Sequence, residues 1–246
     1  MTKSARRAVA RPRTTPSRLD RPERLVQAAH ELLVERTLSG FKVLDVAARA
    51  GANVALINYH FGGRDGLLDE VVRRVAGQIA QTRAERLAAL LASCPAGLPS
   101  PLDVLRCWLE PWLESVEHEN NREVMMLMLD VMFAADVDRS RKERLLESSV
   151  EVTGRFVGVL TRIFPAVSRE QMTWRMLCAV GSSYLVLGQA HPIGWEKLAH
   201  HGKRSMQPVR QQAVKELVTF ILAGLSAPSA AIAGAGPAPR RKATGR

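Results

Sequence analysis

Residues 52–60 include side chains whose chemistry suits the edges of DNA bases. Asn58 carries a donor and an acceptor that match the edge of an adenine, and Leu56 or Ala55 can touch the methyl group of a thymine. The small side chains of Ala52 and Ala55 would let the backbone approach a groove closely. Few side chains here distinguish one base from another, so sequence recognition would rest on few contacts.

Further residues around this segment suit contacts with phosphate groups. Tyr59, His60 and Arg64 stand at its end, and Lys42 precedes it. A helix that begins near Arg64 would add backbone N–H donors at its N-terminus. Such contacts fix orientation rather than sequence. Alternatively, Tyr59 and His60 only stabilise a small bundle of helices.

Two short helices are expected to position these side chains. The first spans Val43–Ala50, Gly51 permits a sharp turn, and Asn53 can cap a second helix that runs to about Phe61. Gly62 and Gly63 would end the second helix.

The second helix must bury one side and offer the other. If Ile57 is the buried reference, a rotation of about 100° per residue directs Ala55 and Tyr59 to the opposite side. Leu56 and Asn58 flank that outer side. The inward or capping positions are Asn53, Val54 and Phe61.

Helical spacing of apolar residues extends along the rest of the chain. Aliphatic residues and alanine dominate the 46% hydrophobic fraction, and aromatic residues supply only 5%, so we predict an all-α protein. Ser100 with Asp103, and Ser168 with Gln171, have the spacing of helix N-caps. The other expected helices begin near residue 22 and then span about 64–93, 101–117, 121–135, 139–164, 169–188 and 207–225.

The charge is concentrated in the two ends. The chain has a formal net charge of +11, but residues 1–24 carry eight Lys or Arg against two acids, and residues 227–246 carry four and no acid. We expect residues 1–20 and 227–246 to be disordered basic arms. They are either merely solvated or attract the phosphate backbone without reading sequence.

Other function classes lack support in the sequence. The three cysteines are scattered, and the H-E-x-x-H, G-x-S-x-G and phosphate-loop patterns do not occur. We therefore expect no enzyme activity, no cofactor and no metal site. The sequence also shows no export signal and no convincing membrane span, which predicts a cytoplasmic, nucleoid-associated protein.

The stretch from Val46 to Phe61, followed by Arg64-Asp65-Gly66-Leu67-Leu68, resembles the DNA-binding domain of bacterial tetracycline-repressor-type (TetR/AcrR) regulators. Its Asn-Tyr-His-Phe end resembles one subgroup of that family. The resemblance implies a three-helix helix-turn-helix domain over 21–75, joined by a long helix to a helical ligand-binding and dimerisation domain over 76–226. Lys42 and Gly63 stand where capping residues are common, which predicts weaker starts for the helices that follow them. The implied DNA-binding residues are Lys42, Ala52, Asn53, Ala55, Leu56, Asn58, Tyr59, His60 and Arg64.

The resemblance also implies two further sites. An effector pocket would be surrounded by a methionine- and aromatic-rich set that suits an apolar ligand, unless these residues only fill the core. A four-helix dimer interface would involve the last two long helices, unless they form an internal core. The pocket residues are Trp108, Trp112, Met125, Met128, Met132, Phe133 and Phe156. The interface residues are Trp174, Cys178, Gly181, Tyr184, Leu185, Val214, Leu217 and Ile221.

The expected function is that of a ligand-responsive repressor that binds a palindromic operator in double-stranded DNA as a homodimer. A transcriptional activator with the same fold is one alternative. A non-specific nucleic-acid-binding protein that uses its basic arms is another, and an enzyme or ligand carrier on a helical scaffold is a third.

Overall fold

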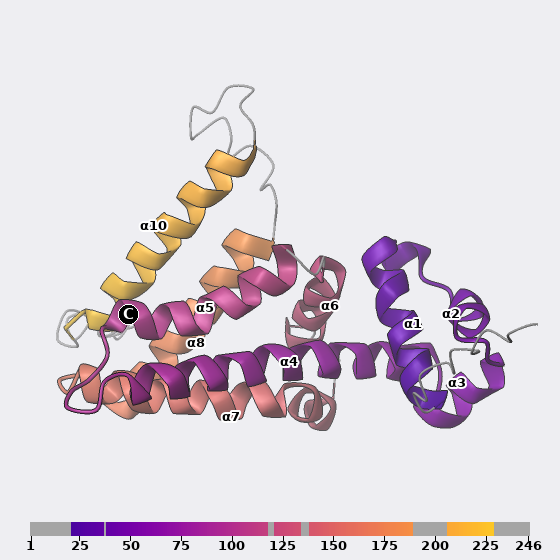
Figure 1. Ribbon diagram of the computed structural model, residues 1–246, viewed down its shortest axis with the longest axis horizontal. Coiled ribbons are helices and arrows are strands. Elements are labelled where there is room, and N and C mark those ends of the chain that lie inside the picture. The colour runs from indigo at the N-terminus through magenta and orange to yellow at the C-terminus, as the bar shows by residue number, and fades with distance from the viewer. Residues whose placement is uncertain (1–20, 37, 118–120, 134–137, 189–205, 229–246) are drawn as a thin grey trace, which may run out of the picture.

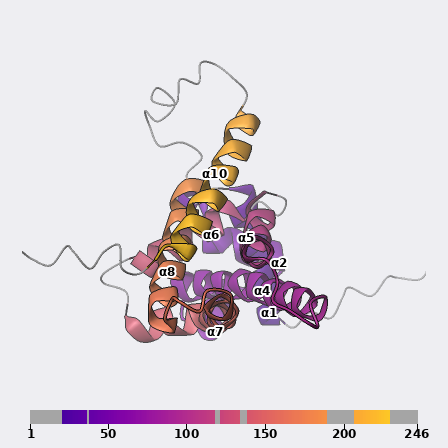
Figure 2. The same cartoon turned by 90° about the vertical axis from the view of Figure 1, so that its left-hand side faces the viewer.

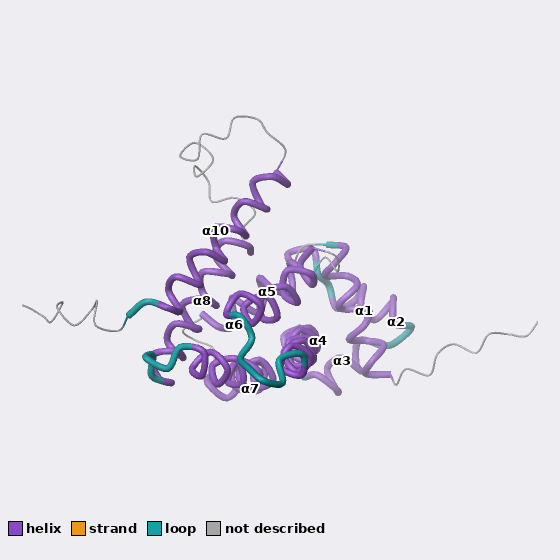
Figure 3. Tube along the Cα trace, turned by 60° about the vertical axis from the view of Figure 1, so that its left-hand side comes forward, coloured by secondary structure: helices purple, strands orange, loops and turns teal. Residues whose placement is uncertain are grey.

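The computed structural model describes residues 21–36, 38–117, 121–133, 138–188 and 206–228 (Figure 1). Every regular element in these ranges is a helix, and none of them is a strand (Figure 3). The prediction of an all-α protein is therefore confirmed. The arm 1–20 and the tail from 229 onward lie outside the described residues.

Three helices form a small bundle at one end of the molecule (Figure 1). They are α1 (Arg21–Glu35), α2 (Val43–Ala50) and α3 (Val54–Phe61), with a 3-10 turn, η1 (Leu38–Gly40), between the first two. The apolar side of α1 is buried against neighbouring helices, which include α2, α3 and the long helix that follows α3. The residues of that side are Leu25, Ala28, Ala29, Leu32 and Leu33.

A long helix, α4 (Arg64–Ala92), leaves this bundle and continues as the axis of the larger domain (Figure 1). Two helices pack along it, α5 (Pro101–Glu117) and α7 (Arg139–Ile163), and Figure 2 shows α7 end-on beside α4. Between them and the small bundle lies α6 (Arg122–Phe133), which contacts both α1 and α4.

The last two described helices, α8 (Arg169–Gly188) and α10 (Met206–Ser226), pack against each other. Arg175 of α8 donates to the carbonyl oxygens of Leu225 and Ala227, at 2.6 and 2.7 Å, and so holds the end of α10. The first turns of α10 extend beyond the other helices in both views (Figures 1 and 2).

Both predicted N-caps are present. The Ser100 hydroxyl accepts from the Asp103 amide at 3.1 Å. Ser168 and Gln171 form a reciprocal capping box, with side-chain bonds of 3.2 and 3.1 Å to each other's amide groups. Local side-chain chemistry therefore sets where α5 and α8 begin.

The helix boundaries differ little from those expected. The helix predicted over 121–135 is α6, Arg122–Phe133, and the residues after it, 134–137, lie outside the described part. The division between two domains at residue 75 falls inside the continuous helix α4, and remains a prediction. Among the helices described, none is long and apolar enough to span a bilayer.

Candidate nucleic-acid interface

The turn between α2 and α3 is built as its sequence predicts. Gly51 adopts a left-handed conformation with φ 62°, which an L side chain would resist. Asn53 is extended, and its side-chain oxygen accepts from the Ala55 amide at 2.9 Å. Because this oxygen caps α3, it orients the helix. The DNA-contact role predicted for Asn53 stays a prediction.

One residue anchors α3 and the residues across from it are free to make contacts. Ile57 has no exposed surface, whereas the Tyr59 side chain is 82% exposed. Ala55, Asn58 and His60 are also exposed. Tyrosine combines an apolar ring with a polar hydroxyl and is enriched at interfaces. The outward face of α3 is therefore a surface suited to a ligand.

The flanking positions of α3 are less open. Ala52 and Leu56 are half-buried and pack against the core of the bundle. The rings of Tyr59 and His60 meet edge to face, with centroids 5.0 Å apart, and His60 also lies 6.1 Å from Phe61. Both rings therefore hold their place on the helix as well as facing outward.

Arg64 and Lys42 lie close to the same stretch of chain. The Arg64 guanidinium lies 5.6 Å from the Phe41 ring centroid and donates to the Leu38 carbonyl at 3.4 Å. Lys42 follows Phe41 directly and is exposed. Phe41 is thus adjacent to two cations, Lys42 as its chain neighbour and Arg64 at its ring. This placement suits phosphate contacts, although Arg64 also ties α4 to η1.

The starts of α2 and α4 lack side-chain caps, as predicted. Lys42 and Gly63 occupy the two N-cap positions without a capping hydrogen bond. No side chain at these positions accepts from the backbone N–H groups in the first turns of α2 and α4. Those groups can donate to another acceptor, such as water or phosphate.

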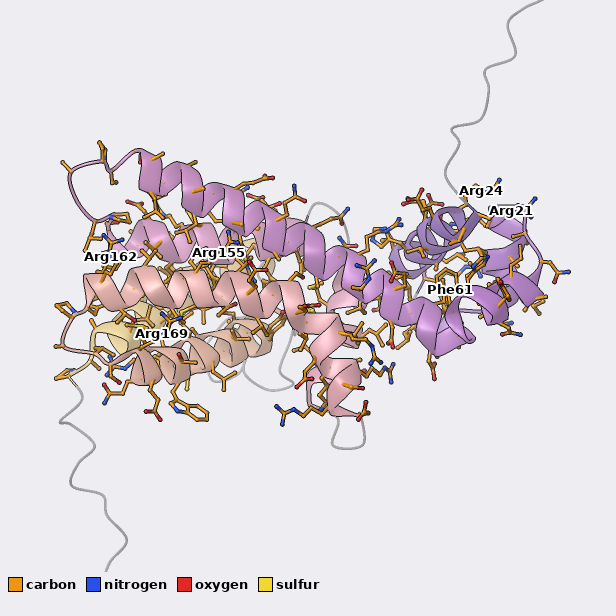
Figure 4. The ribbon with its side chains drawn as sticks, turned by 90° about the horizontal axis from the view of Figure 1, so that it is seen from below. Arg21, Arg24, Phe61, Arg155, Arg162 and Arg169 are labelled. Carbon is orange, nitrogen blue, oxygen red and sulfur yellow. The ribbon has the colours of Figure 1, made fainter. Side chains whose placement is uncertain are left out.

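Not every arginine of the bundle is available to a ligand. Arg49 of α2 forms two hydrogen bonds of 2.7 Å with the Glu35 carboxylate of α1. This pairing holds the pKa of the exposed Glu35 carboxyl below its usual range. Arg36 likewise pairs with Asp45. These two arginines join α1 to α2. Arg24 lies exposed where α1 begins (Figure 4).

The sequence interpretation missed the role of Gly66. A Cβ atom at this position would lie 1.8 Å from the carbonyl oxygen of Phe61. The end of α3 and the first turn of α4 therefore touch through their backbones. Gly62 and Gly63 complete the turn, with φ of 72° and 119°. The three glycines within five residues were the available signal.

Comparison with known proteins accounts for both parts of the chain. Residues 25–71 match the family described as bacterial regulatory proteins, tetR family. Residues 106–224 match a tetracyclin repressor-like C-terminal domain. The chain thus contains both domains of the tetR family. The finer assignment to an Asn-Tyr-His-Phe subgroup remains a proposal.

Similar curated proteins include several HTH-type transcriptional regulators BetI. The Vibrio vulnificus protein is 28% identical over 120 residues, which are 44% of this chain and 60% of that protein. BetI 1 of Chromohalobacter salexigens is 27% identical over 107 residues, 39% of this chain and 53% of that protein. The Vibrio atlanticus protein is 33% identical over 72 residues, 29% and 36% of the two chains. The chain therefore matches only part of the length of these relatives.

The residues predicted to surround an effector are largely internal. Five of them come from α5, α6 and α7 and belong to one continuous buried core shared with the other helices. They are Trp108, Trp112, Met125, Met128 and Phe156. Met132 and Phe133 belong to α6, but their side chains lie outside the described part. A pocket among these residues is still a prediction.

The residues predicted at the dimer interface divide into two groups. Trp174 and Cys178 are exposed, and Gly181 and Val214 are half-buried. Leu217 and Ile221 are only 4% and 3% exposed within this subunit, so they have no surface to offer a partner. The reason is that α10 turns this side toward its own subunit.

Two more predicted interface residues lie on α8. Tyr184 points inward and meets the ring of Trp112 at 5.3 Å between centroids. The side chain of Leu185 lies outside the described part. On α8 and α10, the large exposed apolar residues that sequence reasoning missed are Leu177, Val186 and Phe220.

Proposed function

We propose that the chain is a ligand-responsive transcriptional regulator, acting as a repressor, which binds a palindromic DNA operator in the cytoplasm as a homodimer. The observation that carries the proposal is the open face of α3, where Ala55 and Tyr59 stand opposite the buried Ile57 and the exposed Asn58 flanks them. A helix anchored on one side and exposed on the other suits insertion into a major groove. The two family matches support the same assignment.

We infer the dimer from the exposed apolar surface of α8 and α10. Trp174, Leu177 and Phe220 are 62%, 52% and 66% exposed. Exposed apolar surface of this kind is typical of a site that binds another protein. The first turns of α10 also extend away from the other helices of the subunit (Figure 1). Because helices gain most of their stability from packing, we infer that the same elements of a second subunit cover them.

A link between the two domains passes through α6. His30 of α1 hydrogen-bonds the side chain of Asn121, whose amide donates to the Ser115 hydroxyl of α5 at 2.9 Å. Glu123 accepts from the Leu38 amide of η1 at 3.0 Å. A shift of α5 or α6 on effector binding would therefore act on α1 and η1, which position α2 and α3.

Two substitutions test the DNA-binding face, one for base contacts and one for phosphate contacts. In binding titrations with a selected operator, Asn58→Ala is expected to lose about 1–3 kcal/mol and to relax the preference at one base pair in each half-site. Lys42→Ala is expected to weaken binding to all sequences alike and to reduce the salt slope of the affinity by about one.

The matched control is Arg106→Ala, which removes an exposed cation from α5. Arg106 is far along the chain from the DNA-binding face of α3. The substitution should leave both affinity and salt slope unchanged. Removal of residues 1–20 and 227–246 tests the competing hypothesis, in which the basic arms bind nucleic acid without sequence preference. If the truncated chain loses all binding while Asn58→Ala and Lys42→Ala bind normally, the arms and not α3 hold the DNA.

The junction at Asn121 can be tested through stability. Asn121 is 1% exposed and bonds both domains, so Asn121→Ala is expected to lower the free energy of unfolding by about 1–3 kcal/mol. Urea denaturation followed by circular dichroism measures this loss. Arg122→Ala, an exposed neighbour, should stay within about 0.5 kcal/mol of the parent. Equal losses in the two variants would count against the junction.

A further inference from the structure

Arg83 of α4 is a buried cation without an anionic partner among the described residues. Its side chain is one of the few buried charged groups, 8% exposed. Its Nε donates to the Trp108 carbonyl at 2.7 Å, and its guanidinium carbon lies 4.7 Å from the Trp108 ring centroid. No carboxylate pairs with it in the described part of the chain.

The next arginine along α4 shows the contrast. Arg86 lies about one turn on and pairs with Glu114 at 2.6 Å and with Glu110 at 3.4 Å. Acidic side chains of α5 thus pair with the more exposed Arg86, but none of them pairs with the buried Arg83. Burial lowers the pKa of Arg83 to about 10. The group therefore still carries its charge at neutral pH.

The neighbouring side chains of Trp108, Trp112 and Tyr184 offer hydrogen-bond donors around Arg83, and none of the three is an anion. The buried indole N–H group of Trp108 makes no hydrogen bond with the residues that the structure describes, and that of Trp112 lies beside the Tyr184 hydroxyl. Trp112 meets the ring of Tyr184 edge to face. Burial also raises the pKa of the Tyr184 hydroxyl, which keeps it neutral. Helices α4, α5 and α8 thus bring together one cation and several buried hydrogen-bond donors.

We propose that this cluster of Arg83, Trp108, Trp112 and Tyr184 is where the effector binds, and that the effector is an organic acid with an apolar body. The inference rests on the proposed function and names the ligand class of its effector site. A carboxylate would supply the missing counter-charge to Arg83 and accept hydrogen bonds from the indole N–H groups. The surrounding core would contact the apolar body.

Two other ligand classes fit the cluster less well. Tryptophan and tyrosine rings alone would suit a quaternary ammonium ion. Here the Arg83 guanidinium already occupies the face of Trp108 and would repel a second cation. A purely apolar ligand, which the methionine-rich set first indicated, would leave the donors unsatisfied. The proposed acidic head group therefore adds an anion to the apolar body that the methionine-rich set predicts, and the apolar effector stays a prediction.

Calorimetric titration of the full chain with matched probes tests the proposal. The probes are phenylacetate, phenethyl alcohol and benzyltrimethylammonium, and the same three head groups on an octyl chain. We expect at least one acid to bind, with the matching alcohol roughly tenfold weaker or more, and the ammonium compound not to bind.

Variants then assign the acid to Arg83. Arg83→Met should weaken acid binding roughly ten- to a hundredfold and leave alcohol binding unchanged. Trp108→Phe keeps a ring but loses one N–H, and should weaken the acid about two- to tenfold. It serves as the second test if Arg83→Met does not fold. Arg86→Met removes the same charge from the same helix and should change acid affinity less than roughly twofold.

Several results would overturn the proposal. They are binding of no acid, equal binding of acid and alcohol, preferred binding of the ammonium compound, or equal losses in the Arg83 and Arg86 variants. Selection of a DNA site by the same preparation is a separate measurement. If the chain selects a DNA site but acid binding does not depend on Arg83, the proposed function stands and this inference fails. If the chain binds acids through Arg83 but selects no DNA site, the acid-binding site stands and the proposed function as a regulator fails.

Discussion

Gly66→Ala is expected to abolish operator binding and to lower the stability of the DNA-binding bundle by about 3–5 kcal/mol, among the largest effects of a single added methyl group. The new Cβ would lie 1.8 Å from the Phe61 carbonyl oxygen and 2.9 Å from its carbon, and both are backbone atoms that cannot rotate away. α3 and α4 would have to separate. Because α3 carries Asn58 and Tyr59, the candidate DNA-binding face would move with it.

The matched control lies in the same helix. A Cβ at Gly77 would meet nothing within 4 Å, so Gly77→Ala should stabilise α4 by up to about 1 kcal/mol and leave DNA binding intact. Urea denaturation and fluorescence anisotropy with a labelled operator measure the two quantities. If Gly66→Ala retained both stability and affinity, the backbone contact between α3 and α4 would not be what fixes the recognition helix.

The local features of the DNA-binding bundle were predictable because they depend on neighbours in the sequence. The bounds of α2 and α3 were predicted within a residue, since Gly51 and Asn53 set the turn through their own conformation and side chain. The burial of Ile57 and the exposure of Tyr59 followed from helical periodicity alone. Nothing from the larger domain is needed to place these residues.

The features that were missed depend on how helices cross. The need for glycine at position 66 arises only where α3 meets α4, and no periodicity indicates that contact. Arg83 has the sequence surroundings of a solvated residue, and becomes buried because α5 covers it. Leu217 was expected to face a partner subunit, but α10 directs it toward its own core. In each case the direction of a helix relative to its neighbours decides the role.

The second large effect is expected from Phe220→Glu, which should convert the proposed dimer to a monomer and weaken operator binding by roughly a hundredfold or more. Phe220 is 66% exposed on α10, and a carboxylate there would be desolvated against an apolar partner face. A monomer would still insert one α3 helix, but it would lose the gain from occupying two half-sites together. Sedimentation and anisotropy measure mass and affinity.

Val150→Glu is the control that separates an interface on α8 and α10 from a general response to surface charge. Val150 is 67% exposed on α7, almost the same exposure as Phe220, and outside the proposed interface. It should leave both the dimer and the affinity intact. If Val150→Glu produced monomers and Phe220→Glu did not, the interface would lie on α7, and the exposed side of α10 would need another partner. If neither variant changed the mass, a dimer through α8 and α10 would be excluded, since a buried charge cannot be neutral to the face that covers it.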